Sequence, residues 1–224
     1  MKGKLLEIEH LREPSFRLGI QKAGELTLTT INHYNSALKG ICPTYNPDAR
    51  VLYANWETLY GAVAVFFSRN NDLGIFVKNG LLDAAVVGTD TLREAGIKDL
   101  AKIRDIGVEK WPFVYAYPVD RQVRLNEARI VATSFPQITK ECFESRSRQD
   151  MNIVPVSGSV EIMPYLPHAL GLIDGITDIK VTGKTMAENG LISQDEPLTV
   201  FNPVLIANKN SLNDPLKKEF WLAL

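Results

Sequence analysis

The stretch from residue 62 to residue 90, AVAVFFSRNNDLGIFVKNGLLDAAVVGTD, decides the fold class. It contains two short apolar runs, Ala62–Phe67 and Ala84–Val87. A polar loop at 69–72 and a helix-like segment at Leu73–Lys78 lie between them. Strands buried on both faces give such continuous apolar runs, and a helix between two of them is typical of a parallel sheet. We therefore predict a β-α-β unit.

The same alternation continues on both sides of this unit. Further strand-like runs lie at 17–20, 113–117, 129–133, 152–156, 171–177 and 200–207. Helix-like segments lie at 25–38, 91–95, 136–145, 158–165 and 215–224. Two α/β lobes of about 100 residues each, an ordinary domain size, account for this order. We expect an α/β protein with two periplasmic-binding-protein-like lobes, joined by crossing strands and with a cleft between them. The first lobe spans 1–110 plus 198–224, and the second lobe spans 111–197.

The balance of charge limits the class of partner. The chain has 224 residues, with 25 Lys and Arg against 26 Asp and Glu, and a formal net charge of −1. A dedicated nucleic-acid binder normally carries a basic excess, so we expect no nucleic-acid partner. Any strong positive potential must therefore be local.

Cysteine usage and the N-terminal residues point to a cellular compartment. Cys42 and Cys142 have no partner at metal-ligand spacing, which predicts two free thiols in a reducing environment. Charged residues occur at 7–13, where a signal peptide needs an apolar stretch. No apolar run approaches the roughly 18 residues of a membrane span. We expect a cytoplasmic protein with no membrane partner.

The most informative stretch for chemistry is 171–190, GLIDGITDIKVTGKTMAENG. A strand here delivers Asp174 and Asp178, and the turn Thr182-Gly183-Lys184-Thr185 follows just before a short helix. A glycine in such a turn allows close approach of the backbone, and N–H groups and threonine hydroxyls suit a phosphate dianion. The acidic pair suits ribose hydroxyls or a hydrated Mg²⁺. Alone, however, a TGxT sequence is equally typical of an ordinary turn.

A second anion-friendly segment precedes it. Residues Ser157-Gly158-Ser159 come between a predicted strand and a predicted helix, and Glu161 lies in the first turn of that helix. The free N–H groups of a helix N-terminus favour anions. An ordinary helix cap with a first-turn carboxylate explains this segment at least as well when it is taken alone.

These segments resemble ATP phosphoribosyltransferase, the first enzyme of histidine biosynthesis. GSVEIMP and LIDGITDIKVTGKTMAENGL are similar to the family's GSxExxP and DAIVDxxxTGxTLxxNGL. LGIQKAGEL, SRNNDLGIFVKNGLLDAAVVGTDTL and ARIVATSFPQITKECFES resemble further family segments in the same order. The agreement extends from about residue 17 to residue 208, which is far more specific than any single motif.

The resemblance implies transfer of phosphoribose from phosphoribosyl pyrophosphate to N1 of ATP, with Mg²⁺ held mostly through substrate phosphates. It assigns ribose and 5-phosphate binding, in the second lobe, to Glu161, Asp174, Asp178, Thr182, Gly183, Lys184 and Thr185. It assigns acceptor or phosphate binding to Arg69, Asp90, Ser157, Gly158 and Ser159, with the first lobe as the acceptor side. It assigns catalytic roles to Lys22 and Arg50.

One segment departs from the family pattern. The family's first loop usually reads Lys-Gly-Arg, whereas this chain has Lys22-Ala23-Gly24-Glu25, so the lysine is kept and the arginine is absent. Arg50, in NPDARVLY, matches a second family arginine only loosely. Two alternatives therefore stay open: a divergent phosphoribosyltransferase with another purine-like or azole acceptor, and a non-catalytic solute-binding module.

The length resembles that of the short form of the family. Long members carry an additional C-terminal domain that binds histidine. The short form implies a homodimer and a regulatory subunit resembling histidyl-tRNA synthetase. We expect Lys22, Arg50, Arg69 and Lys184 to supply the local positive potential.

Overall fold

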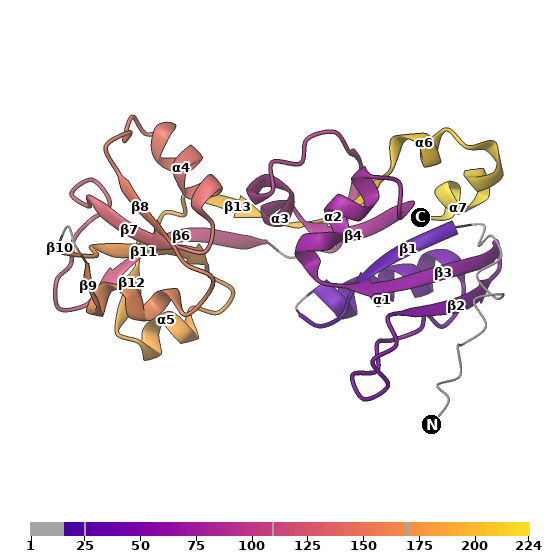
Figure 1. The fold of residues 1–224 in the computed structure, drawn as a ribbon, viewed down its shortest axis with the longest axis horizontal. Helices are drawn as coiled ribbons and strands as arrows, with labels where there is room; N and C mark the ends of the chain where they lie inside the picture. The colour runs from indigo at the N-terminus through magenta and orange to yellow at the C-terminus, as the bar shows by residue number, and fades with distance from the viewer. Residues whose placement is uncertain (1–15, 25, 109, 169–170) are drawn as a thin grey trace, which may run out of the picture. The chain divides into compact units, whose positions relative to one another are not determined.

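The structure is a computed structural model that describes residues 16–24, 26–108, 110–168 and 171–224. The chain divides into two compact units, and each contains a six-stranded sheet (Figure 1). The first unit contains the residues up to 92, 97–108 and 203–224; the second contains 93–96 and 109–202. Two mixed sheets with helices confirm the predicted α/β class with two lobes. The cleft stays a prediction.

The first sheet has the strand order β2-β3-β1-β4-β14-β5. Its strands are β1 (Phe16–Gln21), β2 (Tyr53–Thr58), β3 (Gly61–Ser68), β4 (Ala84–Gly88), β5 (Ala101–Asp105) and β14 (Pro203–Ala207). β1 pairs in parallel with β3 and β4, and the other pairs are antiparallel. The carboxyl ends of β3, β1 and β4 therefore meet at one edge, where α/β sheets place their ligands.

The two faces of β1 pack against different helices. The helices of this unit are α1 (Leu26–Leu38), α2 (Asn70–Lys78), α3 (Thr89–Glu94), α6 (Lys209–Leu212), η3 (Pro215–Lys217) and α7 (Lys218–Ala223). Leu18 and Ile20 pack in one cluster with residues of α1 and α7. On the other face, a Cβ atom at Gly19 would come within 2.7 Å of Leu73 in α2 and of Leu82. Glycine at this position therefore lets α2 approach the sheet closely.

The second sheet has the order β12-β6-β11-β7-β8, and β13 also pairs with β6. Its strands are β6 (Trp111–Pro118), β7 (Ile130–Thr133), β8 (Asn152–Pro155), β11 (Gly175–Ile179), β12 (Leu191–Ser193) and β13 (Thr199–Phe201). Two short strands, β9 (Pro167–His168) and β10 (Gly171–Leu172), pair with each other in a separate antiparallel sheet. β7 pairs in parallel with β8 and β11. These three strands therefore also share a carboxyl edge.

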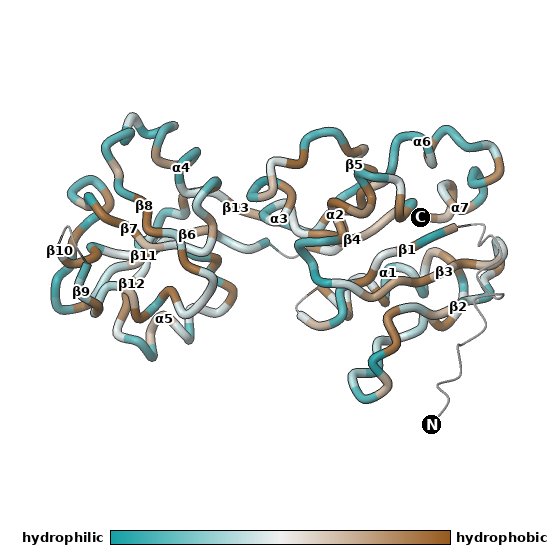
Figure 2. The backbone as a smooth tube through the Cα atoms, viewed as in Figure 1, coloured by the Kyte–Doolittle hydropathy of each residue, from teal (hydrophilic) through white to brown (hydrophobic). Residues whose placement is uncertain are grey.

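Buried threonines join α4 (Pro136–Glu144) to the second sheet. Thr139 Oγ1 lies 2.7 Å from Thr177 Oγ1 and 3.2 Å from Thr133 Oγ1, and Thr133 Oγ1 donates to the carbonyl of Thr177 at 2.9 Å. The other face of the sheet packs against η2 (Val160–Tyr165) and α5 (Lys184–Glu188). Hydrophobic residues gather along the strands in Figure 2, and the connecting loops are mostly hydrophilic.

Several predicted boundaries were wrong. The segment 69–72 is not a loop, because α2 begins at Asn70; polar residues are common in a first turn, and Asp72 there favours the helix dipole. The predicted strand 171–177 is broken at 173–174, where the chain turns back toward β7. The predicted helix 158–165 is a 3₁₀ helix from Val160, and Pro164 within it has no N–H to donate.

The C-terminal segment also differs from its prediction. The run 200–207 is divided into β13 and β14 at Asn202, where the chain passes from the second unit to the first. The closing helix 215–224 consists of η3 followed by α7, and Phe220 and Leu224 are its buried residues. Leu222 is 71% exposed, since it faces away from the cluster that Phe220 joins.

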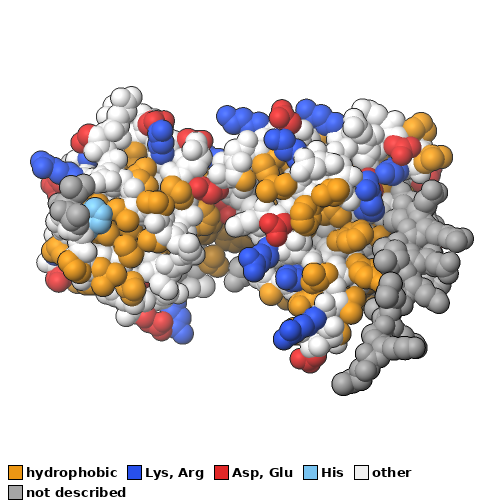
Figure 3. Space-filling view, viewed as in Figure 1, with side chains coloured by type: hydrophobic (Ala, Val, Ile, Leu, Met, Phe, Trp, Pro, Cys, Tyr) orange, Lys and Arg blue, Asp and Glu red, His pale blue; other side chains and the backbone are white. Residues whose placement is uncertain are grey.

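The surface and the cysteines match the composition. Charged side chains of both signs are interspersed on the face shown in Figure 3. Cys42 and Cys142 are buried free thiols, as predicted. Among the described residues, no helix combines the length and the hydropathy needed to cross a bilayer.

Candidate active site

A pocket of about 190 Å³ lies in the second unit, at the carboxyl end of β11. Its lining residues come from η2 and from the contiguous segment after Thr177; they are Glu161, Asp178, Ile179, Val181, Thr182, Gly183, Thr185 and Met186. Five of these were predicted as site residues: Glu161, Asp178, Thr182, Gly183 and Thr185. The structure therefore brings together a carboxylate pair and a donor-rich turn within one unit.

Asp178 is the most perturbed acid of this pocket. Burial raises the pKa of Asp178 to about 6, and the charge of Glu161 adds to this shift. The N–H of Ile179 opposes the shift, because it donates to Asp178 Oδ1 at 2.8 Å. Among the described residues, no lysine or arginine forms an ion pair with Asp178. A half-buried carboxyl group with free acceptor capacity suits the hydroxyl groups of a sugar.

The turn beside Asp178 has the backbone that the sequence requires. Gly183 has φ +74°, in the left-handed region, and α5 begins immediately after it. The N–H of Lys184 donates to Thr182 Oγ1 at 3.2 Å. The side chains of Thr182 and Thr185 are exposed, so their hydroxyls are open to a ligand. This arrangement suits an anion with several acceptor oxygens.

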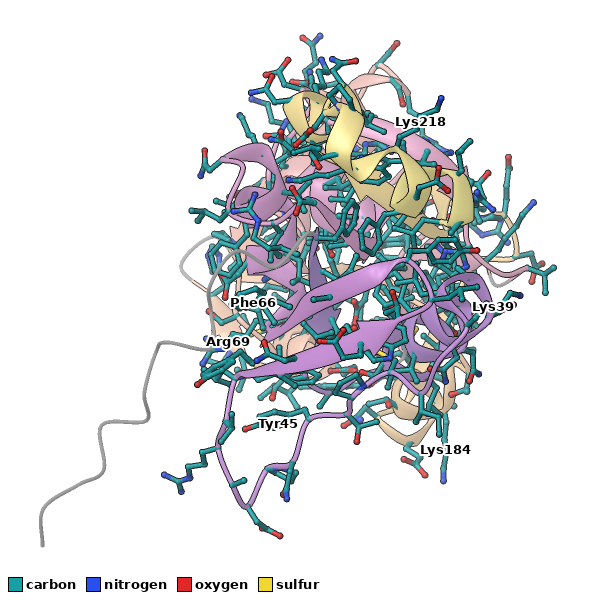
Figure 4. The ribbon with its side chains drawn as sticks, turned by 90° about the vertical axis from the view of Figure 1, so that its right-hand side faces the viewer. Lys39, Tyr45, Phe66, Arg69, Lys184 and Lys218 are labelled. Carbon is teal, nitrogen blue, oxygen red and sulfur yellow. The ribbon has the colours of Figure 1, made fainter. Side chains whose placement is uncertain are left out.

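Lys184 is the member of the turn whose side chain does not line the pocket. It is 77% exposed, and its ammonium lies 3.7 Å from a carboxylate oxygen of Glu188, one helical turn ahead. Figure 4 shows this side chain extending away from the ribbon. The contribution of Lys184 to the pocket is therefore its backbone.

Asp174, which was predicted to share a site with Asp178, immediately precedes the opposite end of β11. Asp174 Oδ2 accepts from the N–H groups of Arg129, at 2.7 Å, and Ile130, at 2.9 Å. The two acids are four positions apart along the extended chain, which corresponds to about 13 Å. Asp174 therefore fixes the beginning of β7 and does not line the pocket.

The Ser157-Gly158-Ser159 segment follows β8 at the shared carboxyl edge but does not line this pocket. All three residues are exposed, and Ser159 has φ +49°. The helix that follows is a 3₁₀ helix of six residues without a side-chain cap. The segment therefore lies at the carboxyl edge of the second sheet, where α/β proteins bind ligands, but it does not form part of the enclosed pocket.

The first unit gathers predicted residues at the carboxyl edge of its own sheet. Lys22 follows β1, and its N–H donates to the carbonyl of Ser68 at the end of β3, at 2.9 Å. Its ammonium lies 5.8 Å from the centre of the Tyr45 ring, within the range of a cation–π contact. Arg69, the next residue after Ser68, is exposed at the N-cap of α2; Figure 4 labels it and Tyr45.

Asp90 lies at the same edge, after β4. It is buried, and burial raises its pKa, although its own N–H, the N–H of Thr91 and the Thr91 hydroxyl oppose the shift. Thr91 Oγ1 also accepts from Asn70 Nδ2 at 2.7 Å. The sequence prediction missed Asn70 and Thr91, because only the parallel pairing of the strands brings their loops together.

Arg50 lies on a different part of the first unit. It is an exposed residue of a turn that precedes β2, with φ +53°, and its N–H donates to the carbonyl of Asn46 at 3.2 Å. The loop that departs from the family pattern continues from Lys22 through Ala23 and Gly24, both exposed. Glu25 lies outside the described residues.

Known proteins match both the sequence and the fold. A family model described as ATP phosphoribosyltransferase matches residues 69–222. The ATP phosphoribosyltransferase of Bacillus cereus is 35% identical over 162 residues, which are 68% of this chain and 74% of that protein. The ATP phosphoribosyltransferase of Methanocaldococcus jannaschii is 35% identical over 175 residues, or 76% of this chain and 58% of that protein.

Two solved structures have a similar fold. The ATP phosphoribosyl transferase (HisG:HisZ) complex from Thermotoga maritima matches with a TM-score of 0.69 and 25% identity, over 93% of this chain and 98% of that chain. A Candida albicans protein described as having the generic periplasmic binding protein fold matches with a TM-score of 0.54 and 10% identity, over 94% of this chain and 69% of that one. The second likeness concerns the fold alone. Because the family model spans most of its length, the chain belongs to the ATP phosphoribosyltransferase family.

Proposed function

We infer that the protein transfers the phosphoribosyl group of phosphoribosyl pyrophosphate to N1 of ATP, in the first step of histidine biosynthesis. Its family membership carries this conclusion. Adenine N1 forms a bond to the anomeric carbon while the bond from that carbon to pyrophosphate breaks, and pyrophosphate leaves with the bonding electrons. The protein must hold two polyanions in register and stabilise the charge that develops between them.

The pocket of the second unit is our proposed site for the phosphoribosyl group. The hydroxyls of Thr182 and Thr185 and the N–H groups of their turn donate to the 5-phosphate. Asp178 and Glu161 accept from the ribose hydroxyls. The observation that supports this placement is the presence of two carboxylates beside a donor-rich turn in one 190 Å³ pocket. Because carboxylates repel phosphate, the 5-phosphate lies at the turn and the ribose hydroxyls lie at the two carboxylates.

The carboxyl edge of the first sheet is our proposed site for ATP. Lys22 and Arg69 provide positive charge for its phosphates, and we propose that Arg50 contributes from its loop. Within the described residues, the side-chain oxygens of Gln21 and Asn70 are buried and have no hydrogen-bond partner. Such acceptors suit the exocyclic amino group of adenine.

Magnesium fits this chemistry mainly through the oxygens of the substrates. Among the described residues, no cluster of three or more acidic, histidine or cysteine side chains could hold a metal. Mg²⁺ typically binds one or two carboxylates together with substrate phosphates, and Asp178 and Glu161 are the carboxylates that fit this role. When bound, the ion neutralises negative charge on the departing pyrophosphate.

We propose that the protein acts in the cytoplasm as a short-form member of its family. The Thermotoga relative is a complex of two components, and this chain covers 98% of the matched one. We therefore propose a homodimer of this chain with a regulatory subunit that resembles histidyl-tRNA synthetase.

An assay of pyrophosphate release tests the activity. The purified chain, alone and with the regulatory subunit, should release pyrophosphate from phosphoribosyl pyrophosphate only when ATP and Mg²⁺ are present. The absence of turnover in both preparations would contradict ATP as the acceptor. Isotope exchange into phosphoribosyl pyrophosphate with other purines and azoles would then identify a divergent acceptor. Tight ligand binding without exchange for any acceptor would favour a solute-binding module.

A further inference from the structure

Lys180 lies directly behind the turn of the second-unit pocket. It follows β11, and its N–H donates to the carbonyl of Pro112 on β6 at 2.8 Å, which fixes its backbone to the sheet. Its side chain is half-buried, and it does not line the pocket. Nothing in the proposed function uses this residue.

The stem of Lys180 lies against the glycine of the turn. A Cβ atom built on Gly183 would lie 2.7 Å from Lys180 Cε, 3.5 Å from Cγ and 3.6 Å from Cδ. The stem therefore occupies the space beside Gly183, where the backbone has φ +74°. The methylene groups of Lys180 fill this space and so restrict the conformations of the turn.

The ammonium group of Lys180 is anchored on a second element. Its Nζ donates to Ser193 Oγ on β12 at 2.8 Å. The same strand packs against α5, the helix that begins after Gly183. Since Nζ is one bond beyond Cε, the positive charge is held within a few ångströms of the glycine.

This charge lies where the pocket needs it. Among the described residues that line the pocket, two are carboxylates and none is a lysine or arginine. Lys184 extends away and pairs with Glu188. A phosphate dianion beside Asp178 and Glu161 requires a compensating positive potential, and a cation behind the N–H groups of the turn provides it.

We propose that Lys180 is a positioning residue for the 5-phosphate of phosphoribosyl pyrophosphate. Its stem supports the Gly183 turn, and its ammonium, held by Ser193, strengthens the field that the turn presents to the anion. The inference rests on the proposed function, because it requires this pocket to be the phosphoribosyl site.

Three variants of the full-length chain separate the two parts of the side chain. Lys180→Met keeps a stem and removes the charge, Lys180→Arg keeps the charge, and Ser193→Ala removes the anchor. Calorimetry with phosphoribosyl pyrophosphate should show affinity falling by about tenfold for Lys180→Met and by about threefold or less for the other two variants. In turnover assays, Lys180→Met should raise the KM for phosphoribosyl pyrophosphate and leave the KM for ATP unchanged.

Thr185→Ala serves as the reference variant. If it loses affinity and Lys180→Met does not, Lys180 has no part in anion binding and the inference is wrong. The inference is equally wrong if Lys180→Met and Lys180→Arg lose affinity to the same extent, because the charge then has no role. If Thr185→Ala also binds normally, the pocket is not the phosphoribosyl site, and that placement fails before the inference about Lys180.

Discussion

Asp83 in the first unit and Asp178 in the second are carboxylates at strand ends whose pKa values move in opposite directions. Burial alone would raise the pKa of Asp83, but hydrogen bonds from Arg17 and Lys217 outweigh it and hold the pKa below its ordinary value. The Arg17 guanidinium donates to Asp83 through Nη2 at 3.1 Å and Nε at 3.2 Å, and Lys217 Nζ lies 2.8 Å from Asp83 Oδ1. Within the part of the chain that the structure describes, Asp178 has no lysine or arginine partner, and its pKa rises to about 6.

The position of each acid in its sheet explains this difference. Asp83 precedes β4 and binds the backbone at the beginning of β1, as Asp174 precedes β11 and binds the backbone at the beginning of β7. Asp178, near the carboxyl end of β11, leaves its acceptor capacity to a ligand. Acids at the amino edge of these sheets stabilise the fold, and acids at the carboxyl edge face the proposed substrates.

The largest predicted effect concerns Asp83. The substitution Asp83→Ala should lower the free energy of unfolding by about 3 kcal/mol, because it leaves Arg17 and Lys217 without their buried partner, which is 1% exposed. Urea denaturation at neutral pH measures the change. Asp105→Ala is the matched control, since it removes an exposed ion pair with Lys102 and should cost less than about 0.5 kcal/mol. Equal costs for both variants would contradict a structural role for Asp83.

The second prediction concerns ligand affinity. Asp178→Asn should weaken phosphoribosyl pyrophosphate by about ten- to a hundredfold, the usual loss for a hydrogen bond to a charged group, without lowering stability. Asp90→Asn in the first unit should instead raise the KM for ATP and leave the affinity for phosphoribosyl pyrophosphate unchanged. Calorimetry and initial-rate kinetics on both variants test this division. A loss of phosphoribosyl pyrophosphate affinity in Asp90→Asn would mean that the proposed division of the two substrates is wrong.

The third prediction is a pH dependence in which stability and binding change in opposite directions. The folded pKa of Asp178, about 6, exceeds the ordinary value of 3.8, so its ionisation costs stability as the pH rises through that interval. We expect a cost on the order of 1 kcal/mol for this partly exposed group. The ionised form accepts from ribose hydroxyls, so ligand affinity should rise over the same interval. Asp178→Asn should remove both trends relative to the unsubstituted protein; a trend that persists belongs to another group.

The extent to which the fold could be predicted depended on where each strand lies. β1, β3, β4, β6 and β7 are interior strands of their sheets, and their apolar runs were identified from the sequence. β2, β5, β8 and β12 lie at the edges of their sheets; β2, β5 and β12 were missed, whereas β8 was identified from the run 152–156. Edge strands face solvent along part of their surface, and Lys102 and Arg104 of β5 are exposed. No continuous apolar run therefore marks β5.

The candidate site was predictable where it is local in the sequence. Asp178 and the turn Thr182–Thr185 follow one another, so one motif identified them. The sequence does not show that β11 begins after Asp174, so it could not show that a strand length separates Asp174 from the pocket. Lys180 has no sequence signal, since its role depends on Ser193 of another strand.

The smallest predicted effect distinguishes the backbone of the turn from its most exposed side chain. Lys184→Ala should change the affinity for phosphoribosyl pyrophosphate by less than about twofold and the stability by about 0.3 kcal/mol, the usual contribution of an exposed pair one helical turn apart. Lys184→Pro also replaces the lysine by a small side chain but in addition removes the N–H that donates to Thr182, so it should weaken binding much more. Circular dichroism checks that both variants are folded. A large loss of affinity in Lys184→Ala would show that this side chain turns toward the ligand, and the positive charge of the pocket would then come from the turn itself rather than from Lys180.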